Sequence, residues 1–300
     1  LNGMIWVLTY YGIKSLAVLI TTSIVSPLIF SKIHFQKSLV ISSIGKIIQI
    51  LLFTFGDGHI AIIMIAAIFA AIEVPFYWIP YHILFLKKLK EPSGHYGKKT
   101  SMRFFLGRIV SGIAPLIGGL VITNFGFPTI FISAVLLLLA SNIPIITAIT
   151  EWKHHEHNIK NVYKNFLFNP KMKLLTIAFA GQGLEAIVVV VFWSIFVFTI
   201  LDSYTKIGLL NSISLLATSV TLLTVGKVLD KGKAKLVHGI GVVNNVFLYI
   251  MKTIVAKPIG IYAMDIADKL NGPLYGLPNM TLSYEKARRL GPSDFIIYRE

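Results

Sequence analysis

Four carboxylate side chains lie inside long apolar stretches of the sequence: Glu73, Glu185, Asp265 and Asp268. A charged side chain near the centre of a membrane-spanning helix costs about 2.5 to 3.5 kcal/mol on insertion scales, so it is expected to have a functional reason. At about 1.5 Å per residue, Glu73 lies roughly 21 Å along a helix from the polar residues on either side of its stretch. A carboxylate at that depth can take up and release a proton. We therefore identify Glu73, Glu185 and Asp268 as candidate proton-coupling residues.

Asp265 and Lys269 are four positions apart, so on one helix their side chains neutralise each other. The simpler interpretation of this pair is a structural salt bridge, and the alternative is a pair of groups that line a cavity. Asp268 is outside that pairing and is expected to remain available. The other basic residues within apolar stretches are Lys14, Lys46 and Arg108. These lie nearer the ends of their stretches, where a long basic side chain is expected to extend toward water.

The segment 73–86 places two prolines and several aromatic residues in an apolar run next to Glu73. Proline frees backbone carbonyl groups, and aromatic faces can stack on a ligand. Tyr77 and Trp78 are therefore candidate cavity residues, although packing is the simpler interpretation of aromatic side chains in membrane helices. Gln182, one turn before Glu185, is a candidate polar group of the same cavity.

A proline pair occurs twice at the same spacing. Pro75 and Pro80 are five apart, and Pro273 and Pro278 follow 198 positions later. The same offset relates several polar breaks and apolar runs over roughly 80 residues, which is typical of a transporter built from two similar halves.

The composition indicates a membrane protein. Of the 300 residues, 55% are hydrophobic and 14% are charged, whereas soluble domains have about 25% charged residues. The formal net charge of +15 does not indicate nucleic-acid binding, because the basic residues occupy short breaks between apolar runs. The absence of cysteine excludes disulfides, thiolate metal sites and cysteine nucleophiles. We expect no cofactor.

Nine stretches are close to the length of about 20 residues that a transmembrane helix needs. They are 5–30, 38–55, 60–86, 104–125, 127–149, 174–201, 207–228, 236–255 and 258–284. One set of alternate loops contains 21 Lys and Arg residues and the other contains three, Lys206, Lys252 and Lys257, which places the first set in the cytoplasm. The fold class expected is an all-α membrane protein of the cell membrane, a polytopic helical bundle with two repeated halves.

The longest polar segment, 151–173, is expected to be a cytoplasmic linker between an N-terminal half, 1–150, and a C-terminal half, 174–300. It contains His154, His155 and His157. A histidine-rich run in a solvated loop lacks the defined geometry of a metal site, so we expect no metal there.

Residues 107–119 resemble the fifth helix of the major facilitator superfamily, whose antiporter members have repeated glycines followed by Gly-Pro-x-x-Gly-Gly. Pro115, Gly118 and Gly119 match this pattern, and Ala114 replaces one glycine. Small residues let helices approach closely in lipid, so we expect Gly112, Gly118 and Gly119 to be packing residues first.

Residues 226–235 resemble the loop motif Gly-x-x-x-Asp-Arg-x-Gly-Arg-Arg of the same superfamily, one residue short before the second glycine. The matching residues are Gly226, Asp230, Lys231, Gly232 and Lys233. The charge of Asp230 is expected to meet a helix end or a basic neighbour and to help hold one conformation, which is a gating role.

The resemblance implies two six-helix halves joined by a cytoplasmic loop. On that plan the nine stretches are helices two to ten, the first helix and the last two are missing, and the polypeptide is expected not to transport alone. The stretches 60–86, 174–201 and 258–284 then correspond to helices that line the central cavity.

The expected function is secondary active transport of a small molecule by alternating access, coupled to protons, with efflux by antiport favoured by the fifth-helix motif. Uptake by symport is the alternative within this class. Two other classes stay open: a multi-span membrane enzyme that acts at the lipid interface, and a transporter-like receptor without flux. The cytoplasmic loops have no recognisable catalytic spacing, so we do not expect an enzyme.

The charge distribution predicts that loops on either side of the third stretch face opposite sides of the membrane. Because the chain has no cysteine, single cysteines at Asp57 and Ser93 can be labelled with a membrane-impermeant thiol reagent. We expect Ser93→Cys to react only from the cytoplasmic side and Asp57→Cys only from the other side. Labelling of both from one side would contradict the nine-span topology.

Overall fold

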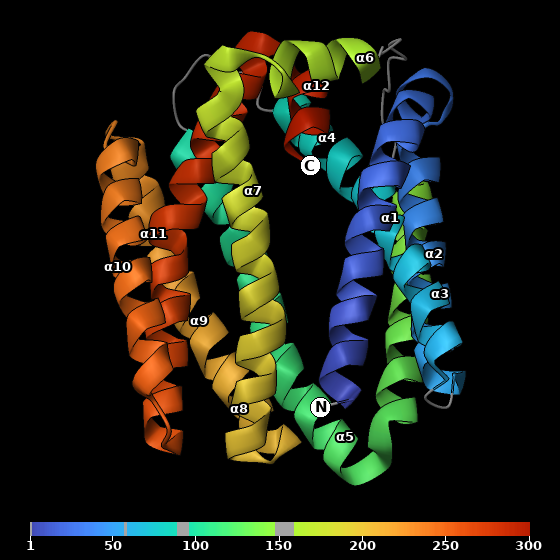
Figure 1. Ribbon diagram of the computed structural model, residues 1–300, viewed down its shortest axis with the longest axis vertical. Coiled ribbons are helices and arrows are strands. Elements are labelled where there is room, and N and C mark those ends of the chain that lie inside the picture. Colours follow the sequence, from blue (N-terminus) through green and yellow to red (C-terminus); the bar gives the residue numbers. More distant parts are fainter. Residues whose placement is uncertain (1, 57–58, 89–95, 148–158) are drawn as a thin grey trace. The chain divides into compact units, whose positions relative to one another are not determined.

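The computed structural model describes residues 2–56, 59–88, 96–147 and 159–300, and every regular element among them is helical (Figure 1). The elements are α1 (Asn2–Lys32), α2 (Phe35–Phe55), α3 (Ile60–Ala71), η1 (Val74–Trp78), α4 (Ile79–Lys88), α5 (Tyr96–Thr147), α6 (Ile159–Val162), η2 (Tyr163–Leu167), η3 (Pro170–Met172), α7 (Lys173–Ile187), η4 (Val188–Trp193), α8 (Ser194–Leu201), α9 (Tyr204–Leu229), α10 (Ala234–Ile254), α11 (Pro258–Leu290) and α12 (Pro292–Arg299). The all-α prediction is therefore confirmed for the described residues.

Seven helical segments of the described residues are long and apolar enough to cross a membrane. They are Ile5–Ser26, Phe35–Phe55, Ile60–Leu86, Lys98–Thr147, Pro170–Leu201, Tyr204–Leu229 and Ala234–Ile254. These segments support a membrane-embedded, multi-pass protein. The predicted span 258–284 lies within α11, which is a continuous helix but is not among the seven.

Two predicted spans, 104–125 and 127–149, fall within the single long element α5. Gly126 interrupts it with φ 80° and ψ 173°. Glycine adopts this positive φ without the steric penalty that a Cβ would introduce. The element thus consists of two helical stretches, and each is long enough to be a span of its own.

The chain packs as two compact units. Unit 1 comprises Leu1–Lys88, Phe127–Phe192 and Ala287–Glu300, and unit 2 comprises Leu89–Gly126 and Trp193–Lys286. This division describes packing, and the division into halves at 1–150 and 174–300 stays a prediction.

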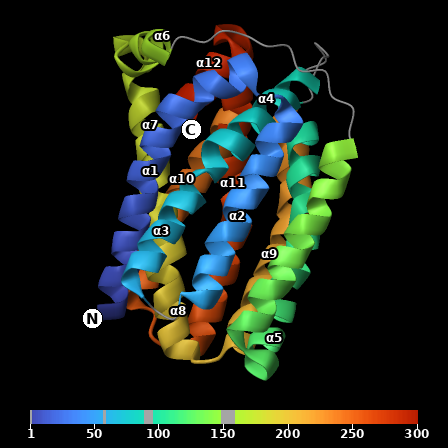
Figure 2. The ribbon, with the colours of Figure 1, turned by 90° about the vertical axis from the view of Figure 1, so that its right-hand side faces the viewer.

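In unit 1, α3 packs against both α1 and α2, and Figures 1 and 2 show the three helices side by side. The α3 residues Ala66, Ala67, Ala70 and Ala71 are almost fully buried, and their small side chains permit close approach of the backbones. At Pro75 the helix forms a wide turn, η1, in which the Ile79 N–H bonds to the Val74 carbonyl, five residues back. The chain stays helical through the proline, and Pro273 and Pro278 likewise lie inside one helix.

In unit 2, the buried side chains of α9, α10 and α11 form an apolar cluster that includes Leu222, Val237 and Leu277. A second cluster joins α8, α9 and α11 through Val197, Leu210 and Ile261.

The N-terminal part of α5 lies directly against α9 within unit 2. A Cβ on Gly119 would lie 2.5 Å from the carbonyl oxygen of Tyr204, and a Cβ on Gly208 would lie 2.3 Å from the carbonyl oxygen of Pro115. The Leu116 N–H also donates to Ser212 Oγ at 3.0 Å. These two glycines therefore let the helix backbones touch.

Three glycines, Gly112, Gly118 and Gly119, were expected to be packing residues, and two of them lie against another helix. Gly112 lies against Leu216, whose Cδ2 would be 2.8 Å from a Cβ there. Gly118, by contrast, has no atom of another described element within 4 Å of such a Cβ, so its packing role stays a prediction. Gly208 was not identified from the sequence because it lies outside the motif.

We expect Gly119→Ala to destabilise the protein by about 1–3 kcal/mol, because the new methyl group meets backbone atoms that cannot rotate away. Gly118→Ala is the matched control, since its methyl group enters open space and alanine is the better helix former. Thermal unfolding in detergent measures both. Equal unfolding temperatures for the two variants would contradict the α5–α9 contact.

Candidate functional site

Glu73 forms an ion pair with a lysine of a neighbouring helix. Its Oε2 lies 3.3 Å from Lys46 Nζ of α2, and its Oε1 accepts a hydrogen bond of 3.2 Å from Trp78 Nε1. Glu73 is therefore not an isolated carboxylate within the apolar helices. Its partner is 27 positions away in sequence, so spacing along one helix gave no sign of it.

We expected Lys46 to lie near a helix end and to extend toward water. It lies instead in the middle of α2 (Phe35–Phe55). Lys14 likewise lies midway along the apolar segment Ile5–Ser26 of α1, and it is close enough to Lys46 and Glu73 for their charges to interact. The interpretation of both lysines as residues that reach a membrane surface is thus wrong. We call Lys14, Lys46 and Glu73 the unit 1 charge cluster.

Polar side chains of α1 and α2 adjoin the unit 1 charge cluster. Gln49 Nε2 donates to the Tyr10 hydroxyl at 2.9 Å, and the other amide atom of Gln49, Oε1, is buried without a hydrogen-bond partner. Lys14 Nζ lies 5.9 Å from the ring centroid of Tyr11. The hydroxyl proton of Tyr10 is left to donate elsewhere, since its oxygen serves as the acceptor for Gln49.

Asp265 is the centre of a polar network in unit 2. Its Oδ1 accepts from Trp193 Nε1 at 3.0 Å, and its Oδ2 accepts from Ser214 Oγ at 2.9 Å. Lys269 Nζ lies 3.8 Å from Asp265 Oδ1, so the salt bridge expected from their four-residue spacing is present. Three donor groups thus surround this buried carboxylate, and such satisfied burial is typical of a structural role.

Asp268 is paired with Lys252 of α10, whose Nζ lies 2.9 Å from Asp268 Oδ2. The same ammonium lies 4.6 Å from the Trp193 ring centroid and 4.9 Å from that of Tyr249, which suits a desolvated cation. The expectation that Asp268 remains available is therefore wrong. Lys252 is also not a loop residue, because it is buried in the last turn of α10.

The candidate cavity residues of the third span make ring contacts with one another. Tyr77 stacks on Tyr81 with centroids 5.6 Å apart and meets Trp78 edge-on at 5.1 Å. Trp78 is 36% exposed, so one of these rings remains accessible. On α7, Gln182 is exposed and Glu185 is half-buried, and their roles stay predictions.

Asp230 meets the beginning of a helix, as its motif suggested. Its Oδ2 accepts a hydrogen bond of 3.1 Å from the backbone N–H of Lys98, near the start of α5. A carboxylate is favourable there because the first N–H groups of a helix have no partner within it and carry partial positive charge.

The remaining residues of the loop motif form the turn between α9 and α10. Gly226 is buried on α9, Lys231 follows Asp230, and Gly232 has φ 77° immediately before Lys233. Such a left-handed residue after a helix end is usually glycine. The motif thus ends one helix and positions the carboxylate that meets another.

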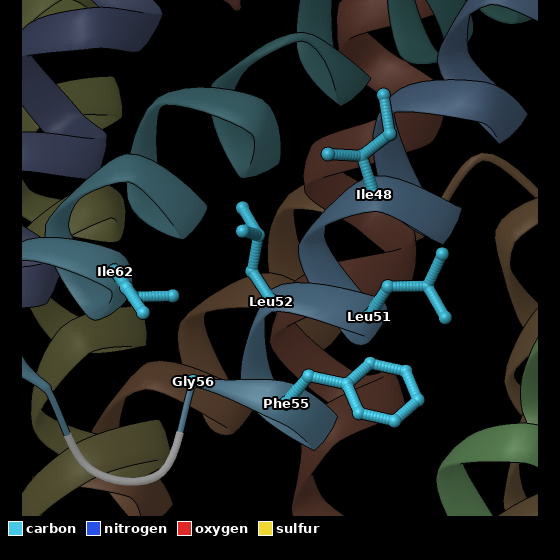
Figure 3. A pocket seen from close by; sticks show the side chains of 6 residues that line it. All are labelled: Ile48, Leu51, Leu52, Phe55, Gly56 and Ile62. Carbon is cyan, nitrogen blue, oxygen red and sulfur yellow. The ribbon is translucent and has the colours of Figure 1, made fainter.

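A pocket between α2 and α3 is lined by Ile48, Leu51, Leu52, Phe55, Gly56 and Ile62 (Figure 3). Apolar side chains from the end of α2 and the start of α3 surround it. It offers no charged or polar side chain that would select a ligand, so the charge clusters are the better candidate sites.

No group of three or more His, Asp or Glu residues among the described residues is arranged to hold a metal ion. The run His154–His157 lies outside the described residues. No family model and no curated protein matches this chain.

Removing one partner of a buried ion pair leaves an uncompensated charge, and this costs about 3–5 kcal/mol. We therefore expect Asp268→Asn to lower the unfolding temperature markedly. The double variant Lys252→Met with Asp268→Asn removes both charges and is expected to regain much of that loss. Thermal unfolding of the three proteins in detergent checks this. A double variant less stable than Asp268→Asn would contradict the pairing.

Proposed function

We propose that the protein is a secondary active transporter of a small molecule, of the major facilitator type, that works by alternating access and is coupled to protons. The observation that carries this proposal is the charged cluster at mid-span of the apolar helices of unit 1, together with the buried ion pairs between α10 and α11 and within α11 in unit 2. Hydrocarbon penalises such groups, so they are kept where they serve a pathway for a polar solute or an ion.

The two clusters differ in accessibility, which suggests different roles. The side chains of Lys46 and Glu73 are 38% and 30% exposed, whereas those of Lys252 and Asp268 are 7% and 9% exposed. An accessible pair can exchange protons and contact a solute, while a sealed pair stabilises the bundle. This contrast favours Glu73 as the proton-coupling residue over Asp268.

The contact between Asp230 and the start of α5 supports a conformational role for the loop motif. Its hydrogen bond joins the end of α9 to the start of α5 through a half-buried carboxylate, and a single hydrogen bond of this kind contributes only about 1.5 to 3 kcal/mol. Alternating access requires contacts of this kind, made in one state and lost in another.

The fifth-helix motif favours efflux by antiport, and uptake by symport is the alternative. In either direction, Glu73 would bind a proton while open to one side of the membrane and release it to the other. The spans beyond the seven and the repeat of two halves belong to the same proposal, as does location in the cell membrane with segment 151–173 in the cytoplasm.

Glu73→Gln tests the coupling role. Glutamine keeps the shape and can still accept a hydrogen bond from Lys46, but it cannot titrate. We expect it to abolish accumulation of substrate driven by a proton gradient while substrate exchange across the membrane continues. Because the 300 residues are expected not to transport alone, flux is measured in membrane vesicles of cells that express the protein from its native gene, with a panel of compounds and with and without a proton gradient.

Asp202→Asn is the matched control, because Asp202 is an exposed acidic residue between two spans, with a positive φ of 40° that asparagine also tolerates. It should accumulate substrate normally. Accumulation by Glu73→Gln with unchanged pH dependence would make Glu73 structural and leave Glu185 as the next candidate.

A further inference from the structure

The unit 1 charge cluster has one positive charge more than its acid can balance. It contains two ammonium groups, of Lys14 and Lys46, and one carboxylate, of Glu73, which is paired with Lys46. Among the described residues, no carboxylate forms an ion pair with Lys14. In unit 2 the corresponding charges balance, because Lys252 pairs with Asp268 and Lys269 with Asp265.

All three charges of the unit 1 cluster lie at mid-span. Lys14 is central in Ile5–Ser26, Lys46 in Phe35–Phe55 and Glu73 in Ile60–Leu86. A net positive charge at this depth cannot be neutralised by lipid headgroups, and hydrocarbon does not solvate it. The cluster therefore has an electrostatic requirement for an anion from outside the described chain.

Neighbouring polar atoms add directional contacts. The Tyr10 hydroxyl accepts from Gln49, so its own proton can donate to a ligand. Gln49 Oε1 is buried without a partner, and it can receive a donor group of that ligand. Two ammonium groups, a hydroxyl donor and an amide acceptor suit a carboxylate solute that also has a hydroxyl group.

We propose that the unit 1 charge cluster binds a small organic anion of the hydroxycarboxylate kind, and that this anion is the transported substrate. The proposal rests on the function proposed above and adds the substrate class to it. Lys14 supplies the uncompensated charge and Lys46 is shared between the anion and Glu73.

This sharing makes anion binding depend on the protonation of Glu73. When Glu73 is ionised it competes with the anion for Lys46, and when it is protonated Lys46 is released to the anion. Because coupling between two ligands is reciprocal, the proton and the anion each favour binding of the other. They would therefore move in the same direction, which supports symport, the alternative named above, over the antiport that the fifth-helix motif favours.

Other charged and titratable groups lie near Glu73 and its neighbour Trp78. From α1 they are Tyr10 and Lys14, whose charges interact with that of Glu73; from α2, Lys46; and from α4, His82, whose ring centroid lies 5.9 Å from that of Trp78. Lysine and tyrosine side chains ordinarily titrate near pH 10, whereas histidine changes charge near neutral pH. The competition for Lys46 is therefore tested at one fixed pH.

Fluorescence quenching of Trp78 tests the excess charge, because this side chain donates to Glu73 and is partly exposed. The probes are iodide, an anionic quencher, and caesium, a cationic one, at matched ionic strength. The difference between the protein and its Trp78→Phe variant isolates the signal of Trp78. Because the cluster has excess positive charge, we expect iodide to quench Trp78 about tenfold more effectively than caesium. This ratio corresponds to a difference of about 1.4 kcal/mol between the two ions in their attraction to the site.

Lys14→Gln should remove most of this preference for iodide, and Lys14→Arg should keep it. Lys206→Gln is the matched control, because it removes an exposed lysine of the other unit. Glu73→Gln should strengthen iodide quenching at fixed pH, because it removes the carboxylate that competes for Lys46. Greater exposure of Trp78 would strengthen quenching by both ions, so a gain for iodide without a gain for caesium reports the change in charge. Equal quenching by both ions, or no effect of Lys14→Gln, would overturn the anion site.

Competition defines the organic ligand. Lactate should relieve iodide quenching at a lower concentration than acetate, which lacks the hydroxyl group. If neither competes, or acetate competes equally, the hydroxycarboxylate assignment fails. Flux separates the two proposals: transport of neutral or cationic solutes alone would overturn the substrate class but not the transporter, and absence of any flux together with intact iodide binding would overturn the transporter only.

Discussion

Hydrocarbon contains no water that could solvate a charge, and this constraint determines how the apolar helices of the chain are arranged. A charged side chain inside such helices is stabilised by a partner on another helix or on the next turn of its own. Lys46 at mid-span of α2 pairs with Glu73, and Lys252 in the last turn of α10 pairs with Asp268 of α11. Each pair joins helices for which apolar burial supplies little drive to associate in lipid.

The part of the structure that follows from local spacing was predictable from the sequence. The apolar stretches identified most helices, and the four-residue spacing of Asp265 and Lys269 identified their salt bridge. The partner of Glu73 was not predictable in this way, because Lys46 lies on another helix and only packing of α2 beside α3 brings the two together. The same holds for Asp268, whose partner Lys252 was assigned to a loop.

The glycine motif of α5 likewise predicted close helix packing but not which glycine makes the contact. A run of small residues indicates that some helix approaches closely, but it does not say which residue faces that helix. Gly119 contacts the backbone of Tyr204, whereas the adjacent Gly118 faces open space, because neighbouring positions on a helix differ by about 100° in direction. The partner glycine, Gly208, is outside any recognised pattern and became evident only from the geometry of α9.

The wide turn η1 has a consequence for how the aromatic side chains after it are oriented. In a regular α-helix, residues five apart differ by about 140° around the axis, so Trp78 would point away from Glu73. The extra residue accommodated by η1 brings the two to the same side, where the indole N–H reaches the carboxylate. Regular winding of the same sequence would rotate α4 by about 100° relative to α3, whereas deleting one residue of η1 would restore regular winding and leave α4 near its present orientation, since four residues turn about 400°. The orientation of α4, with Tyr81 and His82 on it, therefore depends on the extra residue being accommodated in the wide turn.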